Sequence, residues 1–378
     1  MIKIIADNIY SPLGSGTAEN YDAVLQGRSR LRLHEGKWGL PEAFMASLFE
    51  EGEIEGRFAS AYPQAEDYSR FEQMMLLSAT QAVAESGIDA SSPRTLLVLS
   101  TTKGNVSLLE NNSCAVTDSA THLSIAAERI VRFFGNPNQP LVVSNACISG
   151  VCAIIVAQRN LQSGAYDNAV VIGGDEQSAF IVSGFQSFKA LSSVPCRPFS
   201  VNRHGLNLGE AAATVVMSRD TAREGWTLQA GAIRNDAYHL SSPSRQAEGS
   251  YRALRAVIKG FDAEALAVIN THGTATLYND EMESVAIQRA GLDAVPVNGY
   301  KGIYGHTMGA AGVLETILTM HALDKGTLLP TRGFDELGVS CKLVVVTAPT
   351  PTPTRKHAFV KIMSGFGGCN AAILMNKR

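Results

Sequence analysis

Residues 141–163 read LVVSNACISGVCAIIVAQRNLQS, and this stretch decides the fold. It opens with the apolar run 141–144, passes through small and polar residues as far as Gly150, and continues as an apolar segment of helical length. A short continuous apolar run is typical of a strand that is buried on both faces. We therefore predict a strand over 141–144, a tight turn, and a helix over 147–163.

The same alternation of strands and helices extends over the whole chain. Further strands are predicted at 96–100, 169–173, 213–217, 265–270, 294–298, 342–347 and 357–363, and further helices at 69–86, 121–134, 248–259, 279–290 and 307–323. Because the apolar runs are continuous rather than alternating, we expect parallel strands that helices cover on both faces.

A second small-residue turn, Gly305-His306-Thr307-Met308-Gly309-Ala310-Ala311-Gly312, introduces the helix predicted at 307–323. Each half of the chain therefore has the order strand, helix, strand, with one such turn in each half. This repeat predicts an α/β core built from two similar halves. The polar stretch 34–68 is predicted to form an excursion or lid on the first half.

Composition excludes several classes of function. The chain has 378 residues, with 32 basic and 35 acidic residues and a net charge of −3, so we expect no nucleic-acid partner. No apolar stretch approaches the ~18 residues of a membrane-spanning helix, and the start lacks the pattern of a signal peptide. The six cysteines, which include Cys114, form no C-x-x-C pair. We expect a cytoplasmic protein without membrane insertion.

Cys147 stands where the predicted strand ends and the predicted helix begins. The N-terminus of a helix presents unpaired N–H groups and the positive end of the helix dipole. A thiol in this place is expected to have a pKa below its ordinary value of about 8.5, which would make Cys147 a candidate nucleophile. The alternative is a buried structural cysteine, and we expect that role for Cys152.

His272 directly follows the predicted strand 265–270, at the strand end where α/β proteins bind their ligands. A structural histidine is the alternative. Asp280 and Glu283 follow, and we expect them to brace this loop or to cap the next helix. Lys301 and His306 lie in a glycine-rich turn, for which helix packing with an incidental histidine is the alternative.

Phe366 lies among glycines in Ser364-Gly365-Phe366-Gly367-Gly368-Cys369-Asn370. This pattern favours a mobile aromatic side chain whose backbone N–H faces a ligand, and the alternative is a hairpin turn with a core phenylalanine. Together, one cysteine, two histidines and free backbone N–H groups fit thioester chemistry, because they can accept an acyl group and stabilise an enolate or oxyanion. We expect no metal, since the cysteines and histidines lack the spacing of metal ligands.

At these residues the chain resembles the β-ketoacyl-acyl carrier protein synthases, the condensing enzymes that elongate fatty acids and polyketides. The resemblance spans nearly the whole chain. It implies the thiolase-like duplicated αβαβα layered fold, with the nucleophile in an N-terminal half, 1–222, and both histidines in a C-terminal half, 223–378. The motifs that carry it are Cys147-Ile148-Ser149-Gly150-Val151, Gly173-Gly174-Asp175-Glu176, Cys196-Arg197-Pro198-Phe199-Ser200, His272-Gly273-Thr274-Ala275-Thr276 and Gly365-Phe366-Gly367-Gly368.

The resemblance also implies a role for each matching residue. Cys147 takes the acyl chain, while His272 and His306 bind the malonyl thioester carbonyl, promote decarboxylation and stabilise the enolate. The N–H groups of Cys147 and Phe366 form the oxyanion hole, and Phe366 also gates acyl entry. The supporting positions are Lys301 and Glu315 for the electrostatics of the site, Thr274, Thr276 and Ser364 for substrate and phosphopantetheine, and Lys189 for the carrier protein.

The implied partners follow from the same family. Substrates arrive on the phosphopantetheine of an acyl carrier protein, with no cofactor bound covalently, and the enzyme is a homodimer or pairs with a related synthase-like subunit. Three departures favour a specialised synthase, for polyenes or other secondary lipids. Ser364 stands where elongating synthases usually carry Phe, Cys369 stands where Thr is usual, and the chain is shorter than typical members.

Two other functions remain open on this scaffold. A non-catalytic chain-length partner of a synthase heterodimer usually lacks the nucleophile, so the intact Cys147 argues against it. An acyltransferase or thioesterase-like enzyme would form the thioester without making a carbon–carbon bond, and it would not need to decarboxylate malonyl thioesters. The sequence leaves the acyl chain length, its saturation, the pathway and the carrier protein open.

Overall fold

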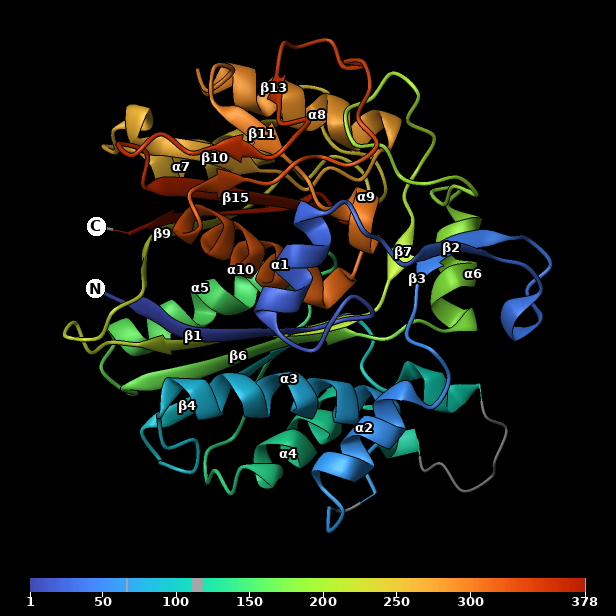
Figure 1. The fold of residues 1–378 in the computed structure, drawn as a ribbon, viewed down its shortest axis with the longest axis vertical. Coiled ribbons are helices and arrows are strands. Elements are labelled where there is room, and N and C mark those ends of the chain that lie inside the picture. The colour runs from blue at the N-terminus through green and yellow to red at the C-terminus, as the bar shows by residue number, and fades with distance from the viewer. Residues whose placement is uncertain (66, 111–117, 378) are drawn as a thin grey trace.

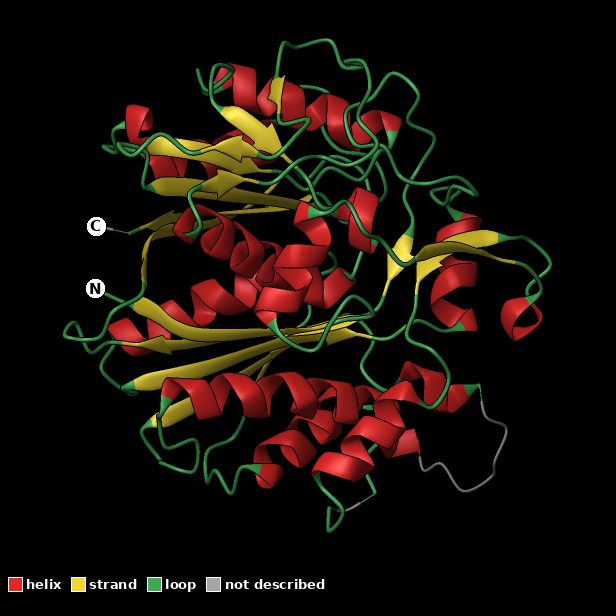
Figure 2. Ribbon diagram, in the orientation of Figure 1, coloured by secondary structure: helices red, strands yellow, loops and turns green. Residues whose placement is uncertain are grey.

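The computed structural model describes residues 1–65, 67–110 and 118–377 of the chain, so Cys114 lies outside the described residues. Helices and sheet regions alternate in layers (Figures 1 and 2). Two helices, α5 (Ser149–Gln162) and α10 (Ala311–Asp324), lie between two regions of sheet. Helices α3 and α4 cover the outer face of one region, and α7 and α8 cover the outer face of the other (Figure 1).

The remaining elements divide between the two predicted halves. In the first half they are β1 (Lys3–Tyr10), α1 (Thr17–Leu25), β2 (Leu31–His34), β3 (Phe44–Ser47), α2 (Glu53–Ala61), α3 (Arg70–Ser86), β4 (Thr95–Ser100), α4 (Leu123–Phe133), β5 (Leu141–Val143), β6 (Asn168–Asp175), α6 (Ala179–Ser187), β7 (Leu208–Gly209) and β8 (Ala211–Ser218). In the second half they are β9 (Trp226–Asn235), α7 (Glu248–Ile258), β10 (Leu266–Asn270), α8 (Leu277–Arg289), β11 (Pro296–Asn298), α9 (Lys301–Tyr304), β12 (Thr327–Leu328), β13 (Val344–Val345), β14 (Thr350–Pro351), β15 (Ala358–Gly365) and β16 (Cys369–Asn376).

The strand order is the same in the two halves. Hydrogen bonds join the strands in the order β13-β11-β10-β15-β16-β9-β1-β8-β6-β4-β5. Strands β1 and β9 pair at the centre of the sheet. In the first half, β1–β8 and β8–β6 are antiparallel pairs and β6–β4 and β4–β5 are parallel pairs. In the second half, β9–β16 and β16–β15 are antiparallel and β15–β10 and β10–β11 are parallel. The duplicated α/β architecture predicted from the repeat is therefore present.

The two central helices meet at glycines. A Cβ atom on Gly150 of α5 would lie 2.9 Å from the backbone N of Val313, and one on Gly312 of α10 would lie 2.6 Å from the backbone N of Val151. Backbone therefore packs on backbone where α5 crosses α10. Because each helix follows one of the two predicted turns, this crossing fixes the two turns relative to each other.

Three expectations about the elements are wrong. Strand β8, predicted at 213–217 as parallel, runs antiparallel to β6 and β1, because a continuous apolar run reports burial on both faces and not strand direction. The helix predicted to start at residue 147 starts at Ser149, and the strand predicted at 342–347 is reduced to Val344–Val345. Strands β9 and β16 were not predicted.

The predicted excursion at 34–68 is ordered over its described residues. It contains β3 and α2, and β3 joins β2 and β7 in a separate three-stranded sheet beside α6 (Figure 1). Phe58 of α2 is buried in a cluster with Tyr68 and Phe71, which ties the excursion to α3. Among the described residues, no helix is both long and apolar enough to cross a membrane.

Candidate active site

Cys147 sits in a tight turn between β5 and α5. The Ser149 hydroxyl donates to the carbonyl of Ala146 (2.6 Å) and accepts from the backbone N–H of Asn145 (2.8 Å), so the turn is closed by its own side chain. Ala146 has φ of 45°, in the left-handed region that non-glycine residues rarely occupy. A strained residue next to a candidate nucleophile is typical of a functional turn.

The environment of the Cys147 thiol corrects the sequence prediction. Burial raises the pKa of Cys147 to about 12, and this effect outweighs the opposing influence of Lys301 and of the backbone N–H groups of Phe366 and Cys147 that donate to the sulfur. The predicted lowering of the pKa by the helix N-terminus is therefore wrong, because desolvation of the buried thiolate has a larger effect than the groups that stabilise it. Cys152 is also buried, as expected for a structural cysteine.

His272 follows β10 and is held by an acidic side chain. The Glu283 carboxylate of α8 accepts from the backbone N–H groups of His272 (2.6 Å) and Gly273 (2.7 Å). Asp280 accepts from the backbone N–H groups of Phe199 (2.7 Å) and Ala275 (3.1 Å). The predicted bracing role of Asp280 and Glu283 is confirmed.

His306 follows α9 through Gly305, whose φ of 68° favours glycine. The Met308 N–H donates to Nδ1 of His306 (3.1 Å), so in the neutral ring the proton lies on Nε2. That Nε2 is buried and has no hydrogen-bond partner among the described residues. Asp175 of β6 anchors the same loop by accepting from the Gly309 N–H (2.7 Å).

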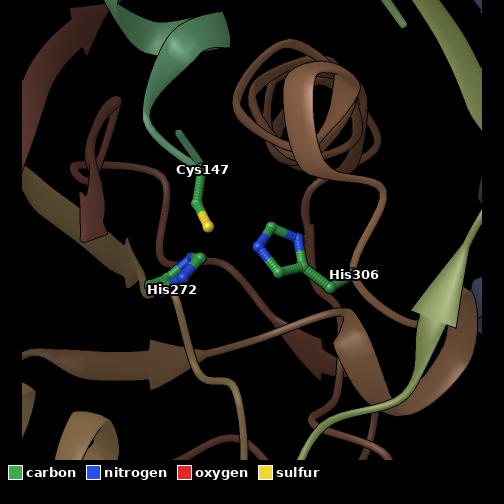
Figure 3. Close-up of side chains that lie close together, drawn as sticks. All are labelled: Cys147, His272 and His306. Atoms are coloured by element: carbon green, nitrogen blue, oxygen red, sulfur yellow. The ribbon is translucent and has the colours of Figure 1, made fainter. Parts of the chain in front are cut away.

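The three candidate side chains converge. The imidazole rings of His272 and His306 are 5.1 Å apart between centroids and nearly perpendicular, and the Cys147 sulfur points toward them (Figure 3). The sulfur and one nitrogen of each ring lie within 4.8 Å of one another. These three side chains could hold a metal ion, although they lie far apart in the sequence. The lack of metal-ligand spacing in the sequence therefore did not predict how close they are in space. The absence of a metal stays a prediction.

Behind His272 lies a cluster of buried charges. Lys301 donates to the carbonyl of His272 (2.6 Å) and to Glu315 (2.7 Å), which places both predicted residues beside the site but outside the cavity. Lys361 of β15 donates to the same Glu315 carboxylate and to the carbonyl of Thr271 (2.8 Å). Sequence reasoning missed Lys361, although a lysine inside the apolar strand 357–363 was a visible signal.

Phe366 lies at the tip of the hairpin that joins β15 to β16. The hairpin turn of one interpretation is confirmed. The mobile aromatic side chain with an N–H that faces a ligand stays a prediction, although the Phe366 N–H donates to the Cys147 sulfur. The ring is not in the core. It packs against Phe185 and Phe188 at the edge of α6, with centroid distances of 5.9 and 5.2 Å.

A cavity of about 380 Å³ opens onto these groups. Its lining includes all the predicted residues except Lys301 and Glu315, namely Cys147, His272, His306, Phe366, Thr274, Thr276, Ser364 and Lys189. Thr276 also caps α8 through the Asn279 N–H, and the Ser364 hydroxyl donates to Asn370 (2.9 Å). Lys189 is exposed at the mouth.

Comparison with known proteins identifies the family. The model of the β-ketoacyl synthase N-terminal domain matches residues 1–222, and the model of its C-terminal domain matches residues 227–335. The chain belongs to the β-ketoacyl synthase family. The predicted family, thiolase-like fold and acyltransferase class are thereby confirmed.

Relatives of this synthase come from different settings. It is 26% identical to 3-oxoacyl-[acyl-carrier-protein] synthase 2 of Coxiella burnetii, over 100% of this chain and 98% of the relative. It is 27% identical to the tetracenomycin polyketide synthase ketoacyl synthase alpha subunit of Streptomyces glaucescens, over 99% and 96%. The solved ishigamide ketosynthase/chain length factor superposes with a TM-score of 0.87 at 25% identity, over 100% of this chain and 99% of that one.

Proposed function

We propose that this synthase joins a Cys147-bound acyl chain to a malonyl unit by decarboxylative Claisen condensation, with both substrates carried on the phosphopantetheine of an acyl carrier protein. The observation that carries the proposal is the convergence of the Cys147 sulfur and two imidazole nitrogens within 4.8 Å, at the base of the cavity. The names of the two relatives, a 3-oxoacyl-[acyl-carrier-protein] synthase and a polyketide synthase subunit, support the same reaction.

In the first half-reaction, the Cys147 sulfur attacks the carbonyl carbon of the acyl thioester. The negative charge that develops on the carbonyl oxygen is stabilised by the N–H groups of Cys147 and Phe366, both of which already face the sulfur. The C–S bond to phosphopantetheine then breaks, and the departing thiolate takes up the proton that Cys147 has lost. The product is an acyl thioester on Cys147 and a free carrier-protein thiol.

In the second half-reaction, His272 and His306 act on the malonyl thioester. His306 offers the Nε2 proton, which is unpaired within the described part of the chain, to the thioester carbonyl oxygen, and His272 supports the same oxygen. The bond to the carboxylate breaks, CO₂ leaves, and its electron pair forms the enolate. The enolate carbon attacks the acyl carbonyl, and the C–S bond to Cys147 breaks to release the β-ketoacyl product. The departing Cys147 thiolate takes up a proton from water and returns to the neutral thiol.

The outer part of the cavity is proposed to receive the carrier protein and its arm. Thr274 and Thr276, whose hydroxyls are 3.0 Å apart on the cavity wall, would contact phosphopantetheine. Lys189 at the mouth would meet the acidic carrier protein. Ser364 would enlarge the acyl pocket, since its side chain is smaller than the phenylalanine usual in elongating synthases.

The wider organisation completes the proposal. Residues 1–222 and 223–378 would be the duplicated halves, which the repeated strand order supports. The synthase would work in the cytoplasm, where the free state of the described cysteines fits a reducing compartment. It would act as a homodimer or beside a related subunit, because the similar ishigamide protein is named as a pair of ketosynthase and chain length factor.

The test is the intact mass of the protein after incubation with acyl-loaded carrier proteins, followed by malonyl-carrier protein. We expect an acyl adduct on the wild type and none on Cys147→Ala, with discharge of the adduct as a β-ketoacyl product. His306→Ala should keep the adduct and lose malonyl decarboxylation by at least about 100-fold, because a general electrophile is removed.

The same measurement separates the alternatives. An adduct that leaves only as free acid, or by transfer to another thiol, would replace the proposal with an acyltransferase or thioesterase-like enzyme. Condensation by Cys147→Ala would show that the nucleophile is assigned wrongly. A wild type that takes no acyl chain, with or without a co-purified synthase subunit, would favour the non-catalytic chain-length partner.

A further inference from the structure

Lys361 is a buried charge that the reaction as proposed does not use. It lies in the middle of β15, between Val360 and Ile362, and none of its surface is exposed. A buried ammonium group is unfavourable unless it is paired and fully hydrogen-bonded. Its position therefore calls for an explanation beyond packing.

Charge pairing alone does not explain the residue. Glu315 is already paired with Lys301 (2.7 Å), and both of these side chains are buried. Lys361 adds a second ammonium group to the same carboxylate, so that Oε1 accepts from one lysine and Oε2 from the other. One lysine would neutralise Glu315, and the second serves another purpose.

The second contact of each lysine shows what that purpose is. Lys361 donates to the carbonyl of Thr271 (2.8 Å), and Lys301 donates to the carbonyl of His272 (2.6 Å). The two ammonium groups thus hold two successive carbonyls of the chain that leaves β10. On the other side, Glu283 holds the N–H groups of His272 and Gly273. Charged side chains from three elements, β15, α9 and α8, therefore fix the peptide units around His272.

These charges also act on the imidazole itself. The titratable groups that face His272 are Cys147, His306, Lys301, Lys361, Glu283 and Glu315. Burial, Lys301, His306 and Lys361 all lower the pKa of His272 well below its ordinary value. The ring is therefore neutral at neutral pH, and it keeps one protonated nitrogen for a substrate oxygen and one unprotonated nitrogen.

We propose that Lys361 is a positioning residue for His272: together with Lys301 and Glu315 it forms a two-lysine clamp that fixes the 271–272 backbone and keeps the imidazole neutral for the malonyl half-reaction. The inference deepens the proposed function and rests on it for the reaction step. Lys301 also lowers the pKa of Cys147, whereas Lys361 acts on His272, so we expect the loss of Lys361 to affect the malonyl half-reaction more than acyl transfer to Cys147.

The test compares Lys361→Met with the wild type in three measurements. We expect malonyl-carrier-protein decarboxylation to fall by about tenfold or more, and Cys147 acylation followed by intact mass to stay within about threefold, because only the His272 step loses its geometry. We expect the His272 imidazole, followed by NMR in histidine-labelled protein, to titrate about half to one pH unit higher, since a nearby positive charge is removed.

Two variants serve as controls. Lys361→Arg keeps the charge and should restore the low titration of His272 and most of the decarboxylation. Lys356→Met removes a lysine that donates to the carbonyl of Leu266 (2.7 Å), at the opposite end of the same strand pair, and should change none of the three measurements. Lys361→Gln provides the second neutral variant where Lys361→Met is poorly folded.

The outcomes separate the inference from the proposed function. Equal losses of acylation and decarboxylation, with an unchanged His272 titration, would overturn the clamp and leave Lys361 a packing role. A wild type that fails to decarboxylate malonyl-carrier protein would overturn the proposed function. In that case the His272 titration in Lys361→Met still decides whether Lys361 acts on the imidazole.

Discussion

At the scale of single residues, Cys147, the proposed nucleophile, is held as a neutral thiol. Lys301 and backbone N–H groups favour the thiolate, but burial of the sulfur removes the water that would solvate it. The second effect is larger. In the proposed reaction, the site therefore acts by stabilising the oxyanion through the N–H groups of Cys147 and Phe366 rather than by lowering the pKa of the thiol.

The raised pKa of Cys147 predicts how the alkylation rate of its thiol depends on pH. Because burial raises the pKa of Cys147 to about 12, alkylation by iodoacetamide should accelerate about tenfold for each pH unit between pH 7 and 9, with no plateau. Only the thiolate reacts, and its fraction rises in that proportion below the pKa. The rate is measured by intact mass, with Cys147→Ala as the control for the other cysteines. A plateau of the alkylation rate near pH 8 would contradict the raised pKa and support the lowered pKa that was predicted from the helix N-terminus.

The residues at the cavity could be predicted from the sequence, as could Lys301 and Glu315 behind it, while Lys361 could not. Cys147, His272, His306 and Phe366 each stand in a turn with glycines or small residues, which is a local pattern. Lys361 has no such pattern: its role depends on β15 lying beside β10, a contact between positions about ninety residues apart. Single-sequence reasoning also misjudged the Cys147 pKa, because desolvation depends on groups brought in by tertiary packing.

At the scale of elements, the crossing of α5 and α10 sets the distance between the two turns. The periodicity of the sequence predicted both helices. It could not predict the direction of strands such as β8, because a parallel and an antiparallel buried strand have the same continuous apolar pattern. The close approach of the helices depends on Gly150 and Gly312, which leave room for the opposing backbone. Gly150 and Gly312, which the sequence pattern assigned to turns, therefore also allow the backbones of α5 and α10 to approach closely.

This crossing predicts the effect of adding one methyl group. In Gly312→Ala, the new Cβ would lie 2.6 Å from the backbone N of Val151, so the helices must move apart. We expect a loss of about 1–3 kcal/mol in the free energy of unfolding, because overpacking outweighs the better helix propensity of alanine. The loss is measured by denaturant unfolding.

Gly184→Ala is the matched control for that variant. Gly184 is an exposed helical glycine of α6, and a Cβ there would meet nothing within 4 Å. We expect it to leave stability unchanged or to raise it by about 0.5–1 kcal/mol. Equal stability of Gly312→Ala and the wild type would contradict the tight crossing.

At the scale of the whole molecule, the sheet has two free edges with different surroundings. One edge is β13, in the second half, and the other is β5, directly before the Cys147 turn. Leu141 of β5 is 36% exposed and Val344 of β13 is 42% exposed, so each edge carries an apolar side chain that is open to solvent. An unpaired edge strand with apolar side chains is a template for pairing with another chain. We expect the predicted dimer to form at β5, because this edge strand directly precedes the turn of the proposed nucleophile Cys147.

The backbone of β5 supplies a specific test of that interface. The Val143 carbonyl accepts from the Thr101 N–H, on the β4 side, so the polar groups of the alternate residue, Val142, face away from the sheet. We expect Val142→Pro to remove an outward N–H without breaking a bond to β4, and to convert a dimer of the purified chain into monomers by light scattering.

Val345→Pro on the opposite edge provides the comparison. The Val346 N–H donates to the carbonyl of Val297, so the groups of Val345 face away from β11 in the same manner. If β5 forms the interface, the Val345→Pro variant keeps the mass of the dimer. The Val142→Pro variant is then expected to lose dimerisation and acylation together, because the Cys147 turn no longer lies beside a second subunit. Dissociation by both variants, or by Val345→Pro alone, would place the interface elsewhere. A wild type that is monomeric alone and becomes a pair only with a related subunit would make the β5 edge a heterodimer surface, and Val142→Pro would then have to block that pairing.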